Sequence, residues 1–154
     1  MLSGRLVQMV EDHAEQLTQS LTIDLKQNAR TPEYHKLPDS EIHDRVFKVY
    51  RDLGEWLGSE GEIQVEAHHT RLGKRRADEG IPLSQVLYAL IRTKKHLIAY
   101  VRRSGVFDSA MDLYQFQEFR RLVDNFFDKA IYYTARAYEH EAASRSTSSA
   151  AMAN

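Results

Sequence analysis

Cysteine is absent from the 154-residue sequence, and the prolines are only Pro32, Pro38 and Pro82. Without cysteine the chain has no disulfide, no thiolate nucleophile and no Cys-ligated zinc or iron–sulfur centre. No apolar run approaches the ~20 residues of a bilayer-spanning helix, and acidic residues interrupt the apolar positions of 1–17, unlike a signal peptide. The net charge of −1 creates no global field toward nucleic acid or membrane. We therefore expect a single, soluble, cytoplasmic domain.

Apolar residues recur at helical spacing along the chain, and no alternating pattern long enough for a β-strand occurs. Asp39 or Ser40 can cap the second helix with a side-chain oxygen, and Gly58 and Gly61 mark its end. The predicted fold class is all-α, a single bundle of five to six helices with a long C-terminal helix. The expected helices cover 6–25, about 40–57, 62–79, 83–103 and 109–143.

A structural corner is predicted where the helix over 62–79 ends. Gly80 tolerates the left-handed backbone that follows a helix end. Pro82 suits the first turn of the next helix, where its missing N–H costs nothing. Leu83 and Leu87 are then expected to hold that helix in the core.

The last helix carries a seam of residues spaced 3-4-3-4, which is typical of helix–helix contacts. We expect this seam to form a dimer contact or to couple the domain to its output. It comprises Phe116, Phe119, Val123, Phe126, Ala130, Tyr133 and Ala137. Residues 144–154 are small and polar, so the division is a helical sensor or dimerisation domain over 1–143 and a flexible linker or tail over 144–154. That linker would lead to an effector domain outside this sequence.

Histidines are the only candidate metal or haem ligands that stand out. His68 and His69 are neighbours, so on a helix their side chains point about 100° apart and do not readily share one metal. His96 is expected in solvent, opposite the apolar stripe of its helix. His69 or His13 could serve as a haem ligand, but surface or half-buried histidines are the favoured interpretation, and we expect no metal or cofactor.

The segment 71–103 is rich in Lys and Arg, as phosphate-binding surfaces are. Its cations face several directions on two helices, so a solvated surface is favoured over a nucleic-acid site. Lys94 differs, because it falls at the centre of the stripe between Leu90 and Leu97. It is a candidate anion anchor, a buried ion-pair partner, or a side chain that extends its amine to water.

Enzyme chemistry finds little support in the sequence. A Gly-rich phosphate loop, a nucleophile elbow and a kinase signature are all absent. The carboxylates are scattered over helix surfaces. We therefore expect a domain that binds and transmits, with no catalytic residues.

The segment RLGKRRADEGIPLSQVLYALIRTKKHL resembles a pattern of the N-terminal domains of RsbR-type stressosome proteins and of related input domains of bacterial kinases. The downstream FFDKAIYYTARAYE is similar to the closing helix of that family. The resemblance implies a globin-like helical domain without haem, which forms a homodimer and signals through its last helix. Its partners would be a downstream effector or kinase domain and stressosome components.

Three functional hypotheses follow. The first is a dimeric, non-catalytic signalling input domain. The second is a haem-binding globin-type sensor of gas or redox state, which needs an inward-facing histidine. The third is a nucleic-acid-binding regulator that uses the cations of 71–76 and 92–103, with steeply salt-dependent binding.

Overall fold

The computed structural model describes residues 4–58, 61–105 and 107–153, and within these ranges it contains helices and no strand. The predicted all-α fold class is therefore confirmed. The helices are α1 (Gly4–Asp12), α2 (Ala14–Gln27), the 3-10 helix η1 (Pro32–Lys36), α3 (Asp39–Arg51), α4 (Leu53–Leu57), α5 (Glu62–Asp78), α6 (Leu83–Ser104) and α7 (Ala110–Ala153). The described ranges thus hold seven α-helices, where five to six were expected.

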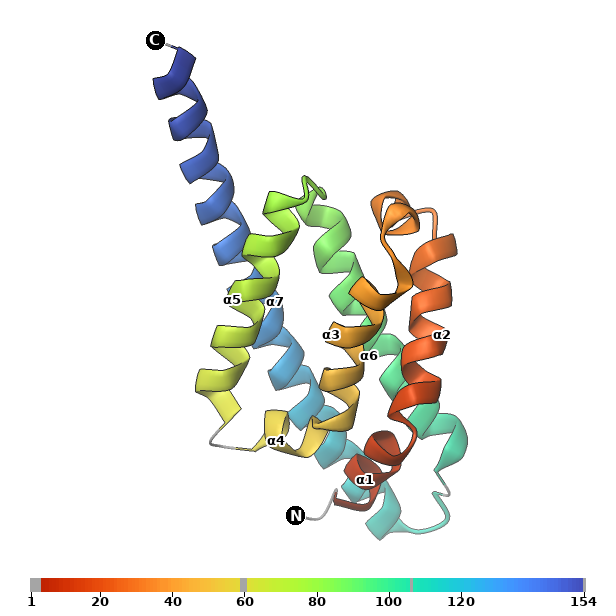
Figure 1. Cartoon of the computed structure of the whole chain (residues 1–154). Helices are drawn as coiled ribbons and strands as arrows, with labels where there is room; N and C mark the ends of the chain where they lie inside the picture. The colour runs from red at the N-terminus through yellow and green to blue at the C-terminus, as the bar shows by residue number, and fades with distance from the viewer. Residues whose placement is uncertain (1–3, 59–60, 106, 154) are drawn as a thin grey trace.

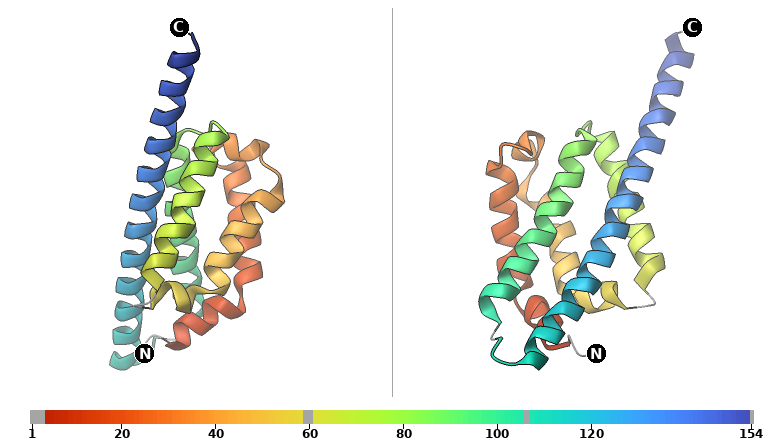
Figure 2. Two further views of the ribbon diagram at one scale, coloured as in Figure 1. Left: turned by 60° about the vertical axis from the view of Figure 1, so that its left-hand side comes forward. Right: turned by 180° about the vertical axis from the view of Figure 1, so that it is seen from behind.

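The longest helix, α7, runs the length of the domain, and its C-terminal end projects beyond the other helices (Figure 1). Helix α5 lies along one side of α7 and α6 along the other, while α2 and α3 form the far side of the bundle (Figure 2). None of the helices in the described ranges combines the length and the apolar composition that crossing a membrane requires. The globin-like topology stays a prediction.

The expected helix over 6–25 is broken at His13, which separates α1 from α2. The His13 ring places Nδ1 2.9 Å from the carbonyl oxygen of Met9, the acceptor that a continuous helix would give to the His13 backbone. The backbone N–H of His13 bonds instead to Val10 O, at 3.1 Å. A side chain that competes for a backbone carbonyl thus explains the break, which apolar spacing alone does not reveal.

The second expected helix begins as α3 at Asp39 itself, after Pro38, and no side chain caps it. The prediction of a cap from Asp39 or Ser40 is therefore wrong. The Asp39 carboxylate lies 2.6 Å from Lys26 Nζ and so ties α3 to α2 instead. A second break, at Asp52, separates α3 from the short α4.

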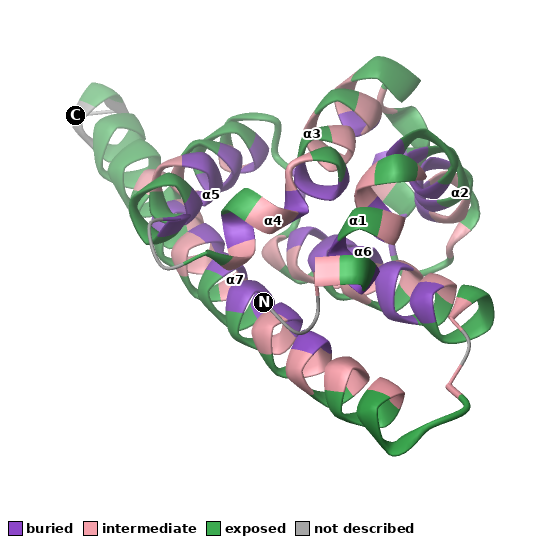
Figure 3. Cartoon of the chain, turned by 90° about the horizontal axis from the view of Figure 1, so that it is seen from below, coloured by how far each residue is buried: buried purple, intermediate pink, exposed green. Residues whose placement is uncertain are grey.

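The hydrophobic core consists of two clusters of buried side chains. The larger cluster joins α1, α3, α4 and α6 to the N-terminal half of α7, and it includes Leu6, Tyr50 and Phe119, which are fully buried. The smaller cluster lies around Leu25 and Ile81, near the N-terminal end of α6. Buried residues line the inner faces of the helices, and the projecting end of α7 is exposed (Figure 3).

The corner between α5 and α6 has the predicted backbone. Gly80 has φ of 74°, the left-handed conformation, and the N–H of Ile81 bonds back to Arg76 O at 3.1 Å. The apolar contacts differ from those expected, because Ile81 is the buried side chain and Leu83 and Leu87 are half-buried at the edge of the bundle. The turn chemistry predicts the backbone, but the direction in which α6 leaves the turn decides which side chains enter the core.

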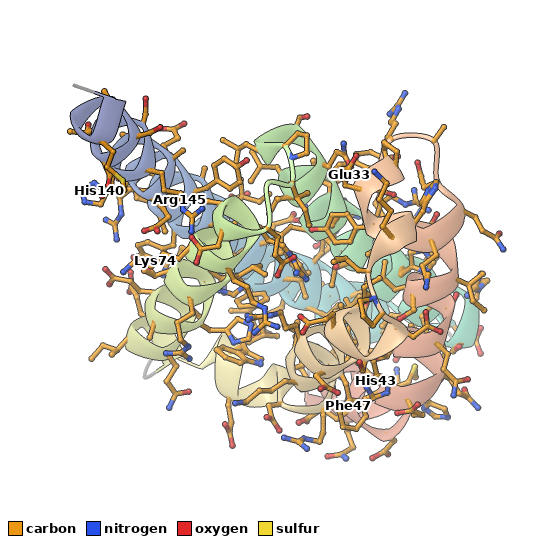
Figure 4. All side chains as sticks on the ribbon, turned by 45° about the horizontal axis from the view of Figure 1, so that its top comes forward. Glu33, His43, Phe47, Lys74, His140 and Arg145 are labelled. Atoms are coloured by element: carbon orange, nitrogen blue, oxygen red, sulfur yellow. The ribbon has the colours of Figure 1, made fainter. Side chains whose placement is uncertain are left out.

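Helix α7 continues to Ala153, ten residues past the expected end. Residues 144–150 are exposed helix, held to the domain by an ion pair of 2.6 Å between Arg145 and Asp78 of α5. Figure 4 shows Arg145 and His140 on this end of α7, above Lys74 of α5. A helical conformation replaces the expected flexible chain here, and the role of 144–154 as a linker stays a prediction.

Gly73 allows α5 and α7 to approach unusually closely. A Cβ atom at this position would lie 2.4 Å from the carbonyl oxygen of Thr134 and 3.0 Å from the Ala137 Cβ. The first of these neighbours is backbone, which cannot rotate away. Any side chain at residue 73 therefore forces the two helices apart.

We predict that Gly73→Ala lowers the free energy of unfolding by about 1–3 kcal/mol, because the methyl group overpacks the α5/α7 contact. Urea unfolding followed by circular dichroism measures the change. Gly4→Ala is the matched control, since nothing lies within 4 Å of a Cβ there. An equal loss in both variants would contradict the close-approach explanation.

Candidate functional site

A small apolar cavity of about 50 Å³ lies inside the bundle, lined by members of both core clusters. Its walls come from α2, η1, α3, α5, α6 and α7. Apolar side chains form most of its surface: Leu25, Ile42, Val46, Val49, Leu72, Val86, Ala89, Leu90 and Phe127. The cavity has room for a few water-sized groups, since one water needs roughly 10–15 Å³.

Two neutral histidines of α5 line the cavity. Burial, together with the nearby His69 ring and Arg45 cation, lowers the pKa of His68 to about 3. Burial also lowers the pKa of His69 to about 4, although its bond to Val65 acts in the opposite direction. His69 Nδ1 lies 2.8 Å from Val65 O, so this nitrogen carries the proton and Nε2 keeps its lone pair.

Arg76 supplies a buried cation to the same wall. It is 2% exposed, and its Nη1 lies 3.0 and 2.9 Å from the two carboxylate oxygens of Glu79. Its guanidinium carbon is 5.4 Å from the centre of the Tyr34 ring. Arg76 Nε is buried without a hydrogen-bond partner among the described residues. One donor of this cation is therefore available to a further acceptor.

An outer groove between α3 and α5 meets the cavity. It measures about 310 Å³ and shares Arg45 and His68 with the cavity lining. Burial lowers the pKa of Arg45, and the neighbouring Arg76 and Arg75 cations lower it further. The groove carries more cations than carboxylates, and its lining consists of Ser40, Glu41, Asp44, Arg45, Lys48, His68, Arg71 and Arg75. An anion therefore finds a favourable potential at the entrance of the cavity.

Lys94 lies at the edge of the buried face of α6, since Thr93, which is 4% exposed, takes the inward position. Its amine is 2.7 Å from Asp124 Oδ1 on α7, and both side chains are partly exposed. Burial opposes ionisation of Asp124, but the Lys94 bond lowers its pKa overall. Of the three alternatives for Lys94, the contact seen is an ion pair within the chain, which is partly exposed and lies outside the cavity.

The seam of α7 faces the interior of its own chain. Phe119, Val123 and Ala130 are each 0% exposed, and Phe126 and Ala137 are nearly as buried. Phe116 and Tyr133 are half-buried beside them. A second copy cannot contact the buried part of this seam, so a dimer contact made through α7 would have to use another face of the helix.

His96 is not in solvent as expected. Its Nε2 lies 2.9 Å from Asp24 Oδ2, and its Nδ1 lies 3.4 Å from Ser20 Oγ. Arg92 Nε shares the same carboxylate oxygen at 2.7 Å. A serine, a histidine and an aspartate in contact resemble the triad of a hydrolase. However, Ser20 lies inside α2, and the backbone N–H groups around it already bond within the helix. They therefore cannot form the oxyanion hole that such a triad needs. The cluster fastens α2 to α6.

The two candidate haem ligands lie in different parts of the described structure. His69 lines the cavity of about 50 Å³, whereas ligand pockets typically measure ~300–1,000 Å³. His13 is half-buried at the break between α1 and α2, with its ring 5.4 Å from that of Tyr100. Within the described residues, no group of three or more His, Asp or Glu side chains could hold a metal ion.

Four of the nine Lys and Arg side chains in 71–103 form ion pairs with carboxylates of the chain: Arg75, Arg76, Arg92 and Lys94. Arg75 bonds to Glu41 and Glu79, while Arg92 and Lys94 hold carboxylates on α2 and α7. The remaining cations are spread over several faces of α5 and α6. This arrangement favours the solvated-surface interpretation over a nucleic-acid site.

Sequence reasoning missed Arg45 and Arg76 as members of a site. A signal existed for Arg76, because it continues the inward helical spacing of Val65, His69 and Leu72. No comparable signal existed for Arg45, because its relation to the cavity depends on how α3 packs against α5. Long-range packing of this kind is not visible in local spacing.

The fold and its internal contacts define an all-helical domain, and one protein family matches it over residues 6–152, described as the RsbT co-antagonist protein rsbRD N-terminal domain. The chain belongs to this family, which confirms the resemblance to RsbR-type N-terminal domains. The family is one of stressosome-related signalling input domains. No curated protein and no solved structure matches the chain.

We predict that stability falls as the pH drops from 7 to 5. The buried histidines stay neutral in the folded state, while the unfolded chain takes up protons below its usual pKa near 6.5. Each histidine then contributes on the order of 1–2 kcal/mol of destabilisation at pH 5. Urea unfolding at a series of pH values measures the slope.

His68→Gln should flatten this pH dependence by about half, because one of the two depressed groups is removed. His140→Gln is the control on the exposed end of α7, and its slope should match that of the unmodified chain. A slope that His68→Gln leaves unchanged would contradict the assignment of the buried pair as its source.

Proposed function

We propose that this chain is a non-catalytic signalling input domain that forms a homodimer and transmits a change of packing through α7. The observation that carries the proposal is the dual role of α7: its middle is core and its end projects past the domain. A displacement imposed on the core-facing part is carried rigidly to the projecting part. The recipient would be a downstream effector or kinase domain, with stressosome components as cytoplasmic partners.

The edge between α6 and α7 is the proposed dimer surface. The two helices run antiparallel in one register, because Lys94 meets Asp124 and, near the other end, the Tyr138 hydroxyl bonds to Ile81 O. Figure 2, right, shows the two helices side by side on the rear face of the molecule. By that register we infer that Leu87 faces the turn of α7 around Ile131.

Partly exposed aliphatic side chains line this edge. Ile91 is 37% exposed, and its neighbours along the strip are half-buried. The strip consists of Leu83, Leu87 and Ile91 of α6 with Ile131 and Ala135 of α7. A twofold axis beside it would bring the same strip from two copies together, as an isologous interface requires. It would also place two α7 helices near each other at the output end.

We predict that Ile91→Glu raises the dimer dissociation constant by on the order of tenfold or more, because a carboxylate would be buried without a partner. Sedimentation equilibrium measures the constant, and native mass spectrometry gives the stoichiometry. Ile63→Glu is the matched control, since Ile63 is 80% exposed on α5 and lies away from the strip.

A chain that stays monomeric at high concentration would contradict the dimer outright. Loss of the dimer in Ile63→Glu but not in Ile91→Glu would place the interface on α5 instead. Circular dichroism of each variant shows whether the helical fold is retained, so unfolding is not mistaken for dissociation.

A further inference from the structure

We propose that the cavity and the outer groove together bind a small monocarboxylate, with the carboxylate at Arg45 and Arg76 and a short apolar tail in the cavity. The proposal rests on the proposed function in one respect: the ligand acts as a signal only if the chain is a signalling domain. The binding itself is a property of the cavity and is measured independently of the dimer.

The charge of the site favours an anion. No carboxylate among the described residues lies within ion-pair distance of Arg45. The nearest acidic groups are already engaged, because Glu41 bonds to Arg75 and Glu79 bonds to both Arg75 and Arg76. Arg45 is half-buried beside two further arginines, so a bound anion would relieve repulsion among these cations.

Arg76 provides a second, independent indication. Its side chain lines the cavity at 2% exposure, and Nε has no hydrogen-bond partner among the described residues. A buried N–H donor without an acceptor is costly, most of all on a charged group. A carboxylate oxygen is the acceptor that satisfies it with a charge-assisted hydrogen bond.

The cavity determines the rest of the ligand. Its walls are apolar apart from the two neutral histidines, Arg45, Arg76, Tyr34 and Thr93. Inorganic phosphate has no apolar part to fill such a space, and a volume of about 50 Å³ admits only a few heavy atoms. If each carbon takes about the space of one water molecule, the cavity holds a tail of roughly two to four carbons. A monocarboxylate with such a tail therefore fits better than phosphate or a long-chain fatty acid.

A path to the cavity exists. Arg45 and His68 line both the outer groove and the cavity, so they stand at the boundary between the two. Exposed Arg71 and Lys48 add positive charge farther out in the groove. An anion is drawn to the groove first, and the apolar tail then enters between α3 and α5.

The test titrates the full chain with sodium butyrate at constant ionic strength and follows the arginine Nε–Hε signals by nitrogen-15 NMR. Two signals, assigned to Arg45 and Arg76 by substitution, should shift saturably. Sodium acetate should bind more weakly, because it lacks the tail, and 1-butanol should leave the Arg45 signal in place. Inorganic phosphate should not displace butyrate.

Two variants separate the head and tail contacts. Arg45→Gln should raise the butyrate dissociation constant by on the order of tenfold or more, since a charge-assisted bond is lost. The control Arg71→Gln removes the same charge from the groove without touching the cavity, and should change the constant less than about twofold. Ala89→Leu fills the cavity and should abolish the preference for butyrate over acetate.

Absence of any saturable shift would overturn the proposal. Equal affinity for acetate and butyrate, or displacement by phosphate, would reduce the site to a general anion groove and overturn the role of the cavity. If Arg45→Gln and Arg71→Gln raised the butyrate dissociation constant equally, the role of Arg45 as the carboxylate partner would be overturned. Sedimentation of the same samples reports the dimer separately, so failure of the proposed function is distinguishable from failure of ligand binding.

Discussion

The contact between α5 and α7 at Gly73 is the constraint on which the rest of the domain depends. Because a side chain at this position would collide with the Thr134 backbone, the two helices pack backbone to backbone. Little side-chain rearrangement is available to absorb a movement there, since close-packed interiors transmit displacement. Helix α5 also carries His69 and Arg76 toward the cavity. The wall of the cavity and α7 are therefore mechanically joined.

Polar groups in the core indicate that stability alone did not shape this interior. A buried cation lowers stability unless it is well paired, and Arg76 Nε has no partner in the described part of the chain, beside the Glu79 contact of its Nη1. Neutral His68 and His69 remain where aliphatic side chains would pack without a desolvation cost. Departures from the rules of core packing are expected at functional sites, where the local cost is offset elsewhere in the fold.

Local signals predicted the helices and the corner, whereas the direction of each face depended on packing that no single stretch encodes. Gly80 and Pro82 fix the turn through their own backbone preferences, so the sequence predicts it. Helical spacing predicts Lys94 at the centre of the buried face of α6, but Thr93, one residue earlier, occupies that centre. The α7 seam was correctly periodic, but periodicity cannot distinguish a neighbouring helix of the same chain from one of a second copy. The cavity needs α3 and α5 together and was therefore not predictable.

A ligand can shift a packing equilibrium only by as much as it binds one state better than the other. A molecule that contacts α5 alone would bind both packings equally and would transmit nothing. A carboxylate held by Arg45 of α3 and Arg76 of α5 is sensitive to the separation of these helices, so it meets the condition. Under this proposal, movement of α5 would displace α7 through the close contact at Gly73, and α7 would shift against α6 beside the Lys94–Asp124 ion pair. The proposed dimer surface lies along that same edge, where a small displacement changes how two copies fit.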